Sequence, residues 1–195
     1  MSGKEFIIDY EENKGEIEYW FSIKCEQKYR RFAELLEFKG EITTWNNVRD
    51  LYRYDKRLIF NCFRYISFLE EYLRAIIVRN SQDREKEYEM WQEKYISDLA
   101  EPIIKLNEQG LSEYHNCDLK DNLKLVQSLR NIISHNKIVL ESDYKKEIAA
   151  LHDLLPSNYI HKFEETIAQS SDGLSISDGW KVIKNFHNLT IISSL

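Results

Sequence analysis

The chain contains few of the residues that interrupt helices. Its 195 residues include only two prolines and six glycines, the residue types that most often end or break a helix. Long helices can therefore form without interruption, and the sequence predicts an all-α fold. The three cysteines, Cys25, Cys62 and Cys117, are odd in number and far apart. This excludes a disulfide-rich scaffold and fits reduced thiols in a cytosol.

Long apolar runs and a positive net charge are also missing. No stretch reaches the length of a membrane span, and the first fifteen residues interrupt a short apolar run with charges, unlike a signal peptide. We therefore expect a cytoplasmic protein that has no membrane partner. The formal net charge of −6 repels polyanions, so nucleic acid could bind only at a local basic patch.

A helical apolar period runs along nearly the whole chain. A hydrophobic content of 43% in 195 residues is enough for one domain with a core. We expect a single helical domain over 1–195, with its core at about 15–170 and a closing helix at about 178–192. A long helix over 54–80 should form its centre. The residues expected on the buried face of this helix are Leu58, Ile59, Phe63, Ile66, Leu69, Leu73, Ile76 and Ile77.

Shorter helices follow from the same period and from capping residues. They are expected over 15–38, over a short segment capped by Thr43 or Thr44, over 119–135 after a cap at Asp118 or Asp121, and over 143–155 and 157–169 on either side of Pro156. The helix over 119–135 has an apolar line of Leu125, Leu129 and Ile132, with Val126 and Ile133 beside it. The polar stretch 81–102 should lie on the surface or bridge to a partner.

The segment "SLRNIISHNK" places three chemically active side chains in an otherwise apolar helix: Arg130, Asn131 and His135. Positions four apart on a helix nearly eclipse, whereas positions five apart differ by about 140°. Asn131 and His135 therefore share a face, and Arg130 lies to one side. The two residues that follow His135 are typical of a helix end, where unpaired carbonyl groups favour a protonated imidazole. The structural alternative is a capping His135 with Arg130 paired to a carboxylate.

Other candidate sites are less well supported. Ser134 beside His135 does not form a catalytic pair, because neighbours on a helix diverge by about 100°. His115 and Cys117 have no second pair of ligands nearby in the sequence, so we expect no metal site and no cofactor. The remaining histidines, His152, His161 and His187, are isolated.

Lysines flank the motif and could supply the local basic patch. Lys124 and Lys137 are the candidate substrate-binding residues, and Lys120 lies near them in the sequence. A solvated helix face is the alternative interpretation of the same charges.

The motif and an upstream helix together resemble the Abi-like (abortive infection) family of the HEPN superfamily. The downstream signature is Arg-Asn-x-x-x-His, at Arg130, Asn131 and His135. The upstream signature is of the Tyr-Asp-x-x-Leu type and ends near Leu-Arg-Ala. It corresponds here to Tyr54, Asp55, Arg57, Leu58, Glu70, Leu73, Arg74 and Ala75. The resemblance spans about residues 52–140.

The resemblance implies a HEPN-like helical bundle with additional helices and a metal-independent RNA endonuclease that acts as a homodimer. In such a dimer the two motifs face each other across the interface. His135 would then be the general acid or base, Arg130 would bind the phosphate, and Asn131 would orient His135 or bind substrate. An antitoxin or regulatory protein is a further implied partner.

Three functions remain open from the sequence. The first is an active ribonuclease in phage defence or a toxin–antitoxin pair. The second is a catalytically silent HEPN module that binds RNA or a partner protein, because a fold does not guarantee an activity. The third is an unrelated helical interaction protein.

Overall fold

The computed structural model describes residues 6–112, 114, 118–142 and 144–182, and these residues form helices and turns without any β-strand. The all-α fold predicted from the sequence is confirmed. The elements are α1 (Tyr10–Ile23), α2 (Glu26–Phe38), α3 (Trp45–Arg79), α4 (Arg84–Gln92), η1 (Ile96–Leu99), α5 (Ala100–Glu108), α6 (Leu119–Ser134), η2 (Val139–Glu141), α7 (Tyr144–Leu154), α8 (Ser157–Ala168) and η3 (Gln169–Ser171).

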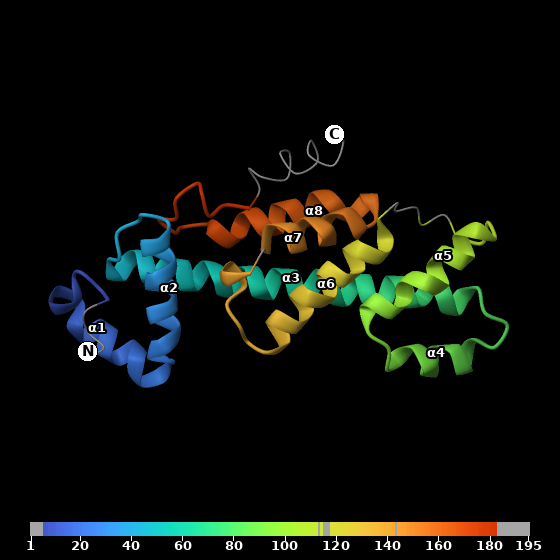
Figure 1. The fold of residues 1–195 in the computed structure, drawn as a ribbon, viewed down its shortest axis with the longest axis horizontal. Coiled ribbons are helices and arrows are strands. Elements are labelled where there is room, and N and C mark those ends of the chain that lie inside the picture. Colours follow the sequence, from blue (N-terminus) through green and yellow to red (C-terminus); the bar gives the residue numbers. More distant parts are fainter. Residues whose placement is uncertain (1–5, 113, 115–117, 143, 183–195) are drawn as a thin grey trace.

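The molecule is elongated along α3, which runs from one end to the other (Figure 1). Helices α1 and α2 lie at one end of α3 and α4 and α5 at the other, while α6 crosses its middle obliquely and α7 and α8 run alongside it. The motif helix α6 therefore lies against the central part of α3.

Helix α3 is one continuous helix of 35 residues and replaces the short and long helices expected from the sequence. Its N-terminus is capped by Thr44, whose hydroxyl accepts a hydrogen bond from the Asn47 backbone N–H at 3.3 Å. No proline or glycine occurs between Trp45 and Arg79, so nothing interrupts the helix.

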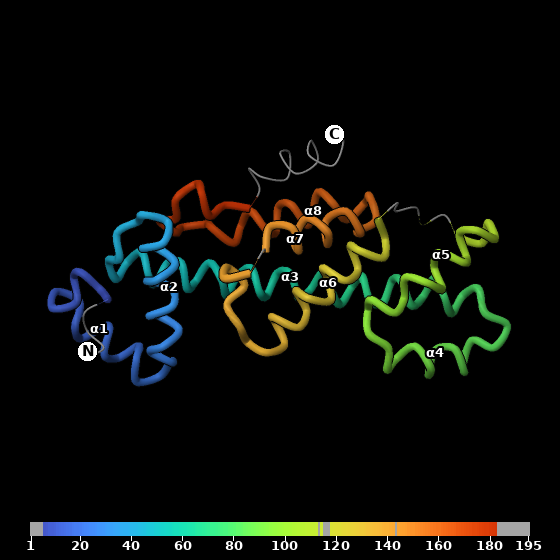
Figure 2. The backbone as a smooth tube through the Cα atoms, viewed as in Figure 1, coloured from blue at the N-terminus to red at the C-terminus, as the bar shows by residue number. Residues whose placement is uncertain are grey.

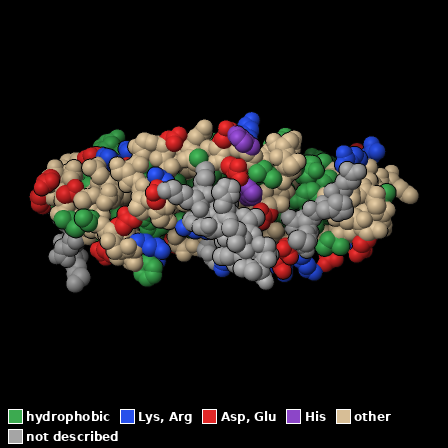
Figure 3. All heavy atoms as spheres, turned by 90° about the horizontal axis from the view of Figure 1, so that it is seen from above, with side chains coloured by type: hydrophobic (Ala, Val, Ile, Leu, Met, Phe, Trp, Pro, Cys, Tyr) green, Lys and Arg blue, Asp and Glu red, His purple; other side chains and the backbone are tan. Residues whose placement is uncertain are grey.

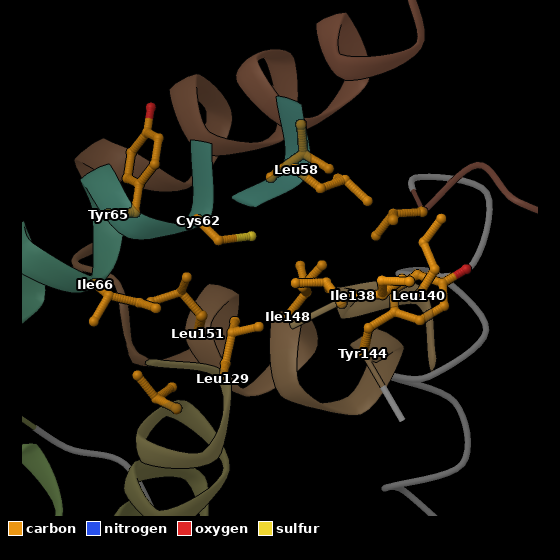
Figure 4. Close-up of a cluster of buried hydrophobic side chains, with 14 of the residues drawn as sticks. Leu58, Cys62, Tyr65, Ile66, Leu129, Ile138, Leu140, Tyr144, Ile148 and Leu151 are labelled. Carbon is orange, nitrogen blue, oxygen red and sulfur yellow. The ribbon is translucent and has the colours of Figure 1, made fainter. Parts of the chain in front are cut away.

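The buried face of α3 is largely as predicted, with one error. Leu58, Ile66 and Leu69 are buried with most of the expected set, and Figure 4 shows part of this α3 face pointing toward Leu129 and side chains of α7. Phe63, in contrast, is 49% exposed. It follows the fully buried Cys62 and so points about 100° away from the core direction.

The expected helix over 15–38 is wrong, because α1 and α2 are separate helices that meet at a corner (Figure 2). Lys24 between them is extended, with φ −131° and ψ 157°. The break lets Phe21 and Tyr29 place their ring centroids 5.5 Å apart. In a straight helix residues eight apart would be separated by about 12 Å along the axis.

Helix α6 buries a line of residues offset from the predicted one. Leu123, Val126 and Leu129 are fully buried, whereas Leu125 and Ile132 are only partly buried. Leu129 lies on both lines and Val126 was expected beside the predicted one, so the buried face is rotated toward Leu123 and Val126.

Helices α7 and α8 lie on either side of Pro156, as predicted. The surface position expected for 81–102 is only partly confirmed, because α4 has no buried residue, whereas Ile96 and Leu99 of η1 are fully buried. Most of the closing helix expected at about 178–192 lies outside the described residues. Within the described ranges, no helix combines the length and the apolar character needed to cross a membrane.

Candidate functional site

The motif residues lie at the C-terminal end of α6. His135 occupies the C-cap position with φ −86° and ψ 8°, and its backbone N–H donates to the Asn131 carbonyl at 3.0 Å. The helix therefore continues up to His135. The side chain of His135 is exposed to solvent.

A Schellman-type turn ends the helix directly after His135. The Asn136 N–H donates to the Ile133 carbonyl at 2.9 Å, and the Lys137 N–H donates to the Ile132 carbonyl at 3.0 Å. Asn136 has φ 51°, a left-handed conformation that asparagine tolerates better than most residues. The prediction that the residues after His135 end the helix is confirmed, and the turn fixes the backbone at His135.

Two lysines from other helices bind this turn. Lys28 Nζ of α2 donates to the Asn136 carbonyl at 2.7 Å, and Lys56 Nζ of α3 donates to Asn136 Oδ1 at 3.0 Å. The turn is therefore tied to α2 and to α3. The two ammonium groups bring positive charge within one residue of His135.

Asp55 anchors the chain that follows the turn. Its Oδ1 accepts hydrogen bonds from the backbone N–H groups of Val139 at 2.8 Å and Leu140 at 3.2 Å. The carboxyl group is fully buried, and this burial raises the pKa of Asp55 to about 6 despite the two hydrogen bonds and the nearby Lys56. Asp55 thus connects the upstream sequence signature to the segment after His135.

Arg130 forms an ion pair with a nearly buried carboxylate. Its Nε lies 3.1 Å from Glu70 Oε1 of α3, and Glu70 is 8% exposed while about a third of the Arg130 side chain is exposed. The contact lacks the angles of a directed hydrogen bond. It fixes Arg130 beside α3, in agreement with the structural alternative of a carboxylate partner.

The motif side chains do not converge within one chain. Among the described residues, no hydrogen bond or ion pair joins the side chains of Arg130, Asn131 and His135. Asn131 Oδ1 instead accepts a hydrogen bond from Gln127 Nε2 at 2.9 Å. The separation expected from helical geometry is therefore present in the structure.

A stripe along one face of α3 carries two exposed aromatic rings. It runs from Lys56, which contacts the turn after α6, to Glu70, which pairs with Arg130 of α6. Lys56, Phe60, Phe63 and Glu70 follow one another at spacings of four, three and seven residues, which places them on one face of the helix. Phe60 is 71% exposed and Phe63 is 49% exposed. Large apolar side chains exposed side by side are typical of an interaction surface.

The lysines predicted from sequence lie at different distances from His135. Lys137 is exposed and follows the turn. Lys124 pairs with Asp121 at 2.9 Å and lies about three helical turns before His135. Sequence reasoning missed Lys28 and Lys56, whose only signal was the position of Lys56 directly after Asp55 in the upstream signature.

The other histidines fall into structural or undescribed positions. His152 hydrogen-bonds Asp153 and Glu164, both at 3.1 Å. Burial lowers its pKa, but these two carboxylates outweigh burial and the net shift is upward. His161 is exposed beside Glu165. His115, Cys117 and His187 lie outside the described residues, and the described ranges contain no cluster of three or more metal-ligating side chains.

Charges are mixed on the face that carries α7 and α8. In the described part of the view in Figure 3, acidic and basic side chains are interspersed. A large surface of one charge is not visible in that view. Near the motif, Lys28 and Lys56 bring two positive charges to Asn136.

No family model, no curated protein and no solved structure matches the chain in the comparisons. The function must therefore be argued from the geometry and chemistry of the residues themselves.

Proposed function

We propose that this protein is a metal-independent RNA endonuclease that acts as a homodimer in the cytoplasm, in abortive infection or as a toxin. The observation that carries the proposal is the position of His135, an exposed acid–base group on a turn held by two other helices. Arg130 and Asn131 precede it on α6 in the order of the Abi-like motif.

The residue types suit RNA cleavage by transesterification. RNA supplies its own nucleophile, the 2′-OH, and needs a base that takes its proton and an acid that protonates the departing 5′-oxygen. The 2′-oxygen bonds to the adjacent phosphorus while the bond to the 5′-oxygen breaks. The products are a 2′,3′-cyclic phosphate and a 5′-hydroxyl. Arg130 stabilises the negative charge on the phosphorane through its Nη groups.

A second copy of the chain supplies the missing convergence. One α6 cannot aim Arg130 and His135 at the same phosphate, whereas two copies related by a two-fold axis present two histidines and two arginines to one groove. The exposed Phe60 and Phe63 give the neighbouring α3 stripe the apolar character of an interface. In the dimer one His135 acts as the base and its counterpart acts as the acid.

A catalytically silent module that binds RNA or a partner protein is the second candidate. The observation that favours it is the pairing of Arg130 with Glu70, because an arginine already committed to a nearly buried carboxylate has less charge to offer a phosphate. In this reading the motif stabilises the contact between α3 and α6 and performs no chemistry.

The test incubates the purified chain with mixed-sequence RNA and with a 2′-deoxy analogue, both in the presence of EDTA, and analyses the ends of the products. We expect cut RNA with 2′,3′-cyclic phosphate and 5′-hydroxyl ends, and an intact deoxy strand. Loss of cleavage in EDTA or cutting of the deoxy strand contradicts the proposed chemistry. RNA that is bound but uncut assigns the chain to the silent module.

A further inference from the structure

We infer that Lys28 and Lys56 form a phosphate-binding subsite beside His135, which holds a phosphodiester of the RNA strand next to the one that is cleaved. The inference rests on the proposed function and adds two residues that lie outside the motif. Lys28 belongs to α2, and Lys56 belongs to α3.

The two ammonium groups meet at a single residue. Lys28 donates to the backbone oxygen of Asn136 and Lys56 donates to its side-chain oxygen, at 2.7 and 3.0 Å. Because Asn136 directly follows His135, an anion bound by both lysines lies one residue along the chain from the motif histidine. Lys137, which follows Asn136, and Lys24 on the loop before α2 add further positive charge.

The charge at this point is poorly neutralised. In the described part of the chain no carboxylate pairs with Lys28, and the Lys56 ammonium lies 3.9 Å from Asp55 Oδ2. Asp55 is buried and its other oxygen is engaged by the backbone, so one carboxylate faces several ammonium groups. Burial lowers the pKa of Lys56, and the neighbouring charges of Lys28 and Lys24 lower it further.

Holding the turn does not require two charges. A neutral amide donor could form either hydrogen bond to Asn136 without repelling its neighbour, whereas paired ammonium groups repel each other until an anion lies between them. Lysine also binds phosphate as a compact point charge with three donors. The arrangement therefore fits a ligand that carries a phosphate group.

The proposed role of His135 in cleaving RNA implies that the phosphate bound by the two lysines belongs to the same RNA strand. A scissile phosphate at His135 belongs to a chain with further phosphates one nucleotide away on either side, and the lysine pair binds Asn136, the residue directly after His135. The subsite would raise affinity for the strand without taking part in proton transfer, so its loss should raise KM more than it lowers kcat.

The experiment measures binding of single-stranded RNA across a salt series in a His135→Ala background, where cleavage cannot intervene. We expect Lys28→Gln and Lys56→Gln each to weaken binding and to reduce the slope of log affinity against log salt by about 0.7. Lys86→Gln removes the same charge from an exposed lysine on α4, at the other end of α3, and should change neither quantity beyond error. Lysine variants that behave like Lys86→Gln overturn the subsite.

A second variant separates phosphate binding from support of the turn. Asn136→Gly keeps the left-handed backbone and both lysine charges but removes the Oδ1 acceptor of Lys56. We expect it to bind RNA with the wild-type salt slope. A loss equal to that of Lys56→Gln would show that the lysine only holds the turn, and would overturn the inference.

A competition experiment with inorganic phosphate distinguishes a phosphate of the RNA strand from a free anion. Inorganic phosphate should compete with RNA in the His135→Ala protein and lose this effect in the Lys28→Gln/Lys56→Gln double variant. If phosphate binding depends on the two lysines but RNA affinity does not, the site binds a free anion and the inference is overturned. If the wild type never cuts RNA but its RNA binding depends on the two lysines, the proposed ribonuclease activity is refuted and the phosphate-binding subsite is supported.

Discussion

Glu70 and Arg130 join the middle of α3 to the last turns of α6 through an ion pair in which Oε1 and Nε lie 3.1 Å apart. Both residues belong to the two sequence signatures that suggested a common family. Because Glu70 is nearly buried, its charge depends on Arg130 for compensation. The pair therefore links the position of the motif arginine to the packing of the two helices.

Removal of Arg130 alone should destabilise the fold. Arg130→Gln leaves the Glu70 carboxylate nearly buried without its partner, and we expect a loss of about 1–3 kcal/mol in the free energy of unfolding, reduced from the fully buried case because Arg130 is partly exposed. Adding Glu70→Gln should restore part of this loss. Urea unfolding of the single and double variants measures both quantities.

Arg64→Gln is the matched control, because Arg64 is exposed on α3 and no carboxylate pairs with it in the described ranges. It should stay within about 0.5 kcal/mol of the wild type. An Arg130→Gln variant as stable as this control would mean that the ion pair contributes little to the fold.

His135→Ala should lower RNA cleavage by about 10²- to 10⁴-fold, the range expected for loss of a general acid–base group. The fold should remain intact, because the exposed side chain of His135 contributes little buried area. Initial rates on a labelled RNA, with circular dichroism as the measure of folding, check both parts. His161→Ala removes an exposed histidine from α8 and should retain full activity. Equal activity of the two variants would reject the catalytic role.

The sequence was informative where local rules decide the structure. The cap at Thr44 and the helix end after His135 are set by residues within a few positions of each other. The sequence predicted the helix end and a cap at either Thr43 or Thr44. The break at Lys24 was not, because it depends on the packing of Phe21 against Tyr29 after the chain has turned. The apolar period continues through the break and favours a single helix.

The residues of the candidate site also fall into those that a local sequence pattern reveals and those that it does not. Arg130, Asn131 and His135 are close in sequence and form a recognisable spacing, so they could be found without a structure. Lys28 lies 108 residues from Asn136, and no local pattern connects them. Lys124 is close in sequence but points to Asp121 about three turns away from His135.

The α3 stripe should support self-association. The double variant Phe60→Ser/Phe63→Ser removes two exposed rings from it, and we expect at least about a tenfold weaker dimer, since aromatic residues contribute strongly to interfaces. Sedimentation velocity at micromolar concentration measures this change. Phe38→Ser alters a ring that is 82% exposed at the end of α2 and should leave the dimer unchanged. A wild type that sediments only as a monomer rejects the composite site.

Asp55 should make stability depend on pH in an unusual direction. Burial raises its pKa in the folded protein to about 6 from a usual value of 3.8, so the folded state binds more protons than the unfolded state between these values. The stability that Asp55 contributes is present in full below about pH 4 and is lost as the pH rises through about 6. The shift corresponds to about 3 kcal/mol.

Asp55→Asn isolates this contribution, because an amide keeps an oxygen acceptor for the Val139 and Leu140 N–H groups but does not titrate. Other carboxylates titrate in both proteins, so the informative quantity is the difference in unfolding free energy between wild type and variant. Urea unfolding from pH 4 to 7 should show wild type losing stability relative to Asp55→Asn as the pH rises. A pH-independent difference would mean that Asp55 is ionised throughout this range, with Lys28 and Lys56 compensating its burial.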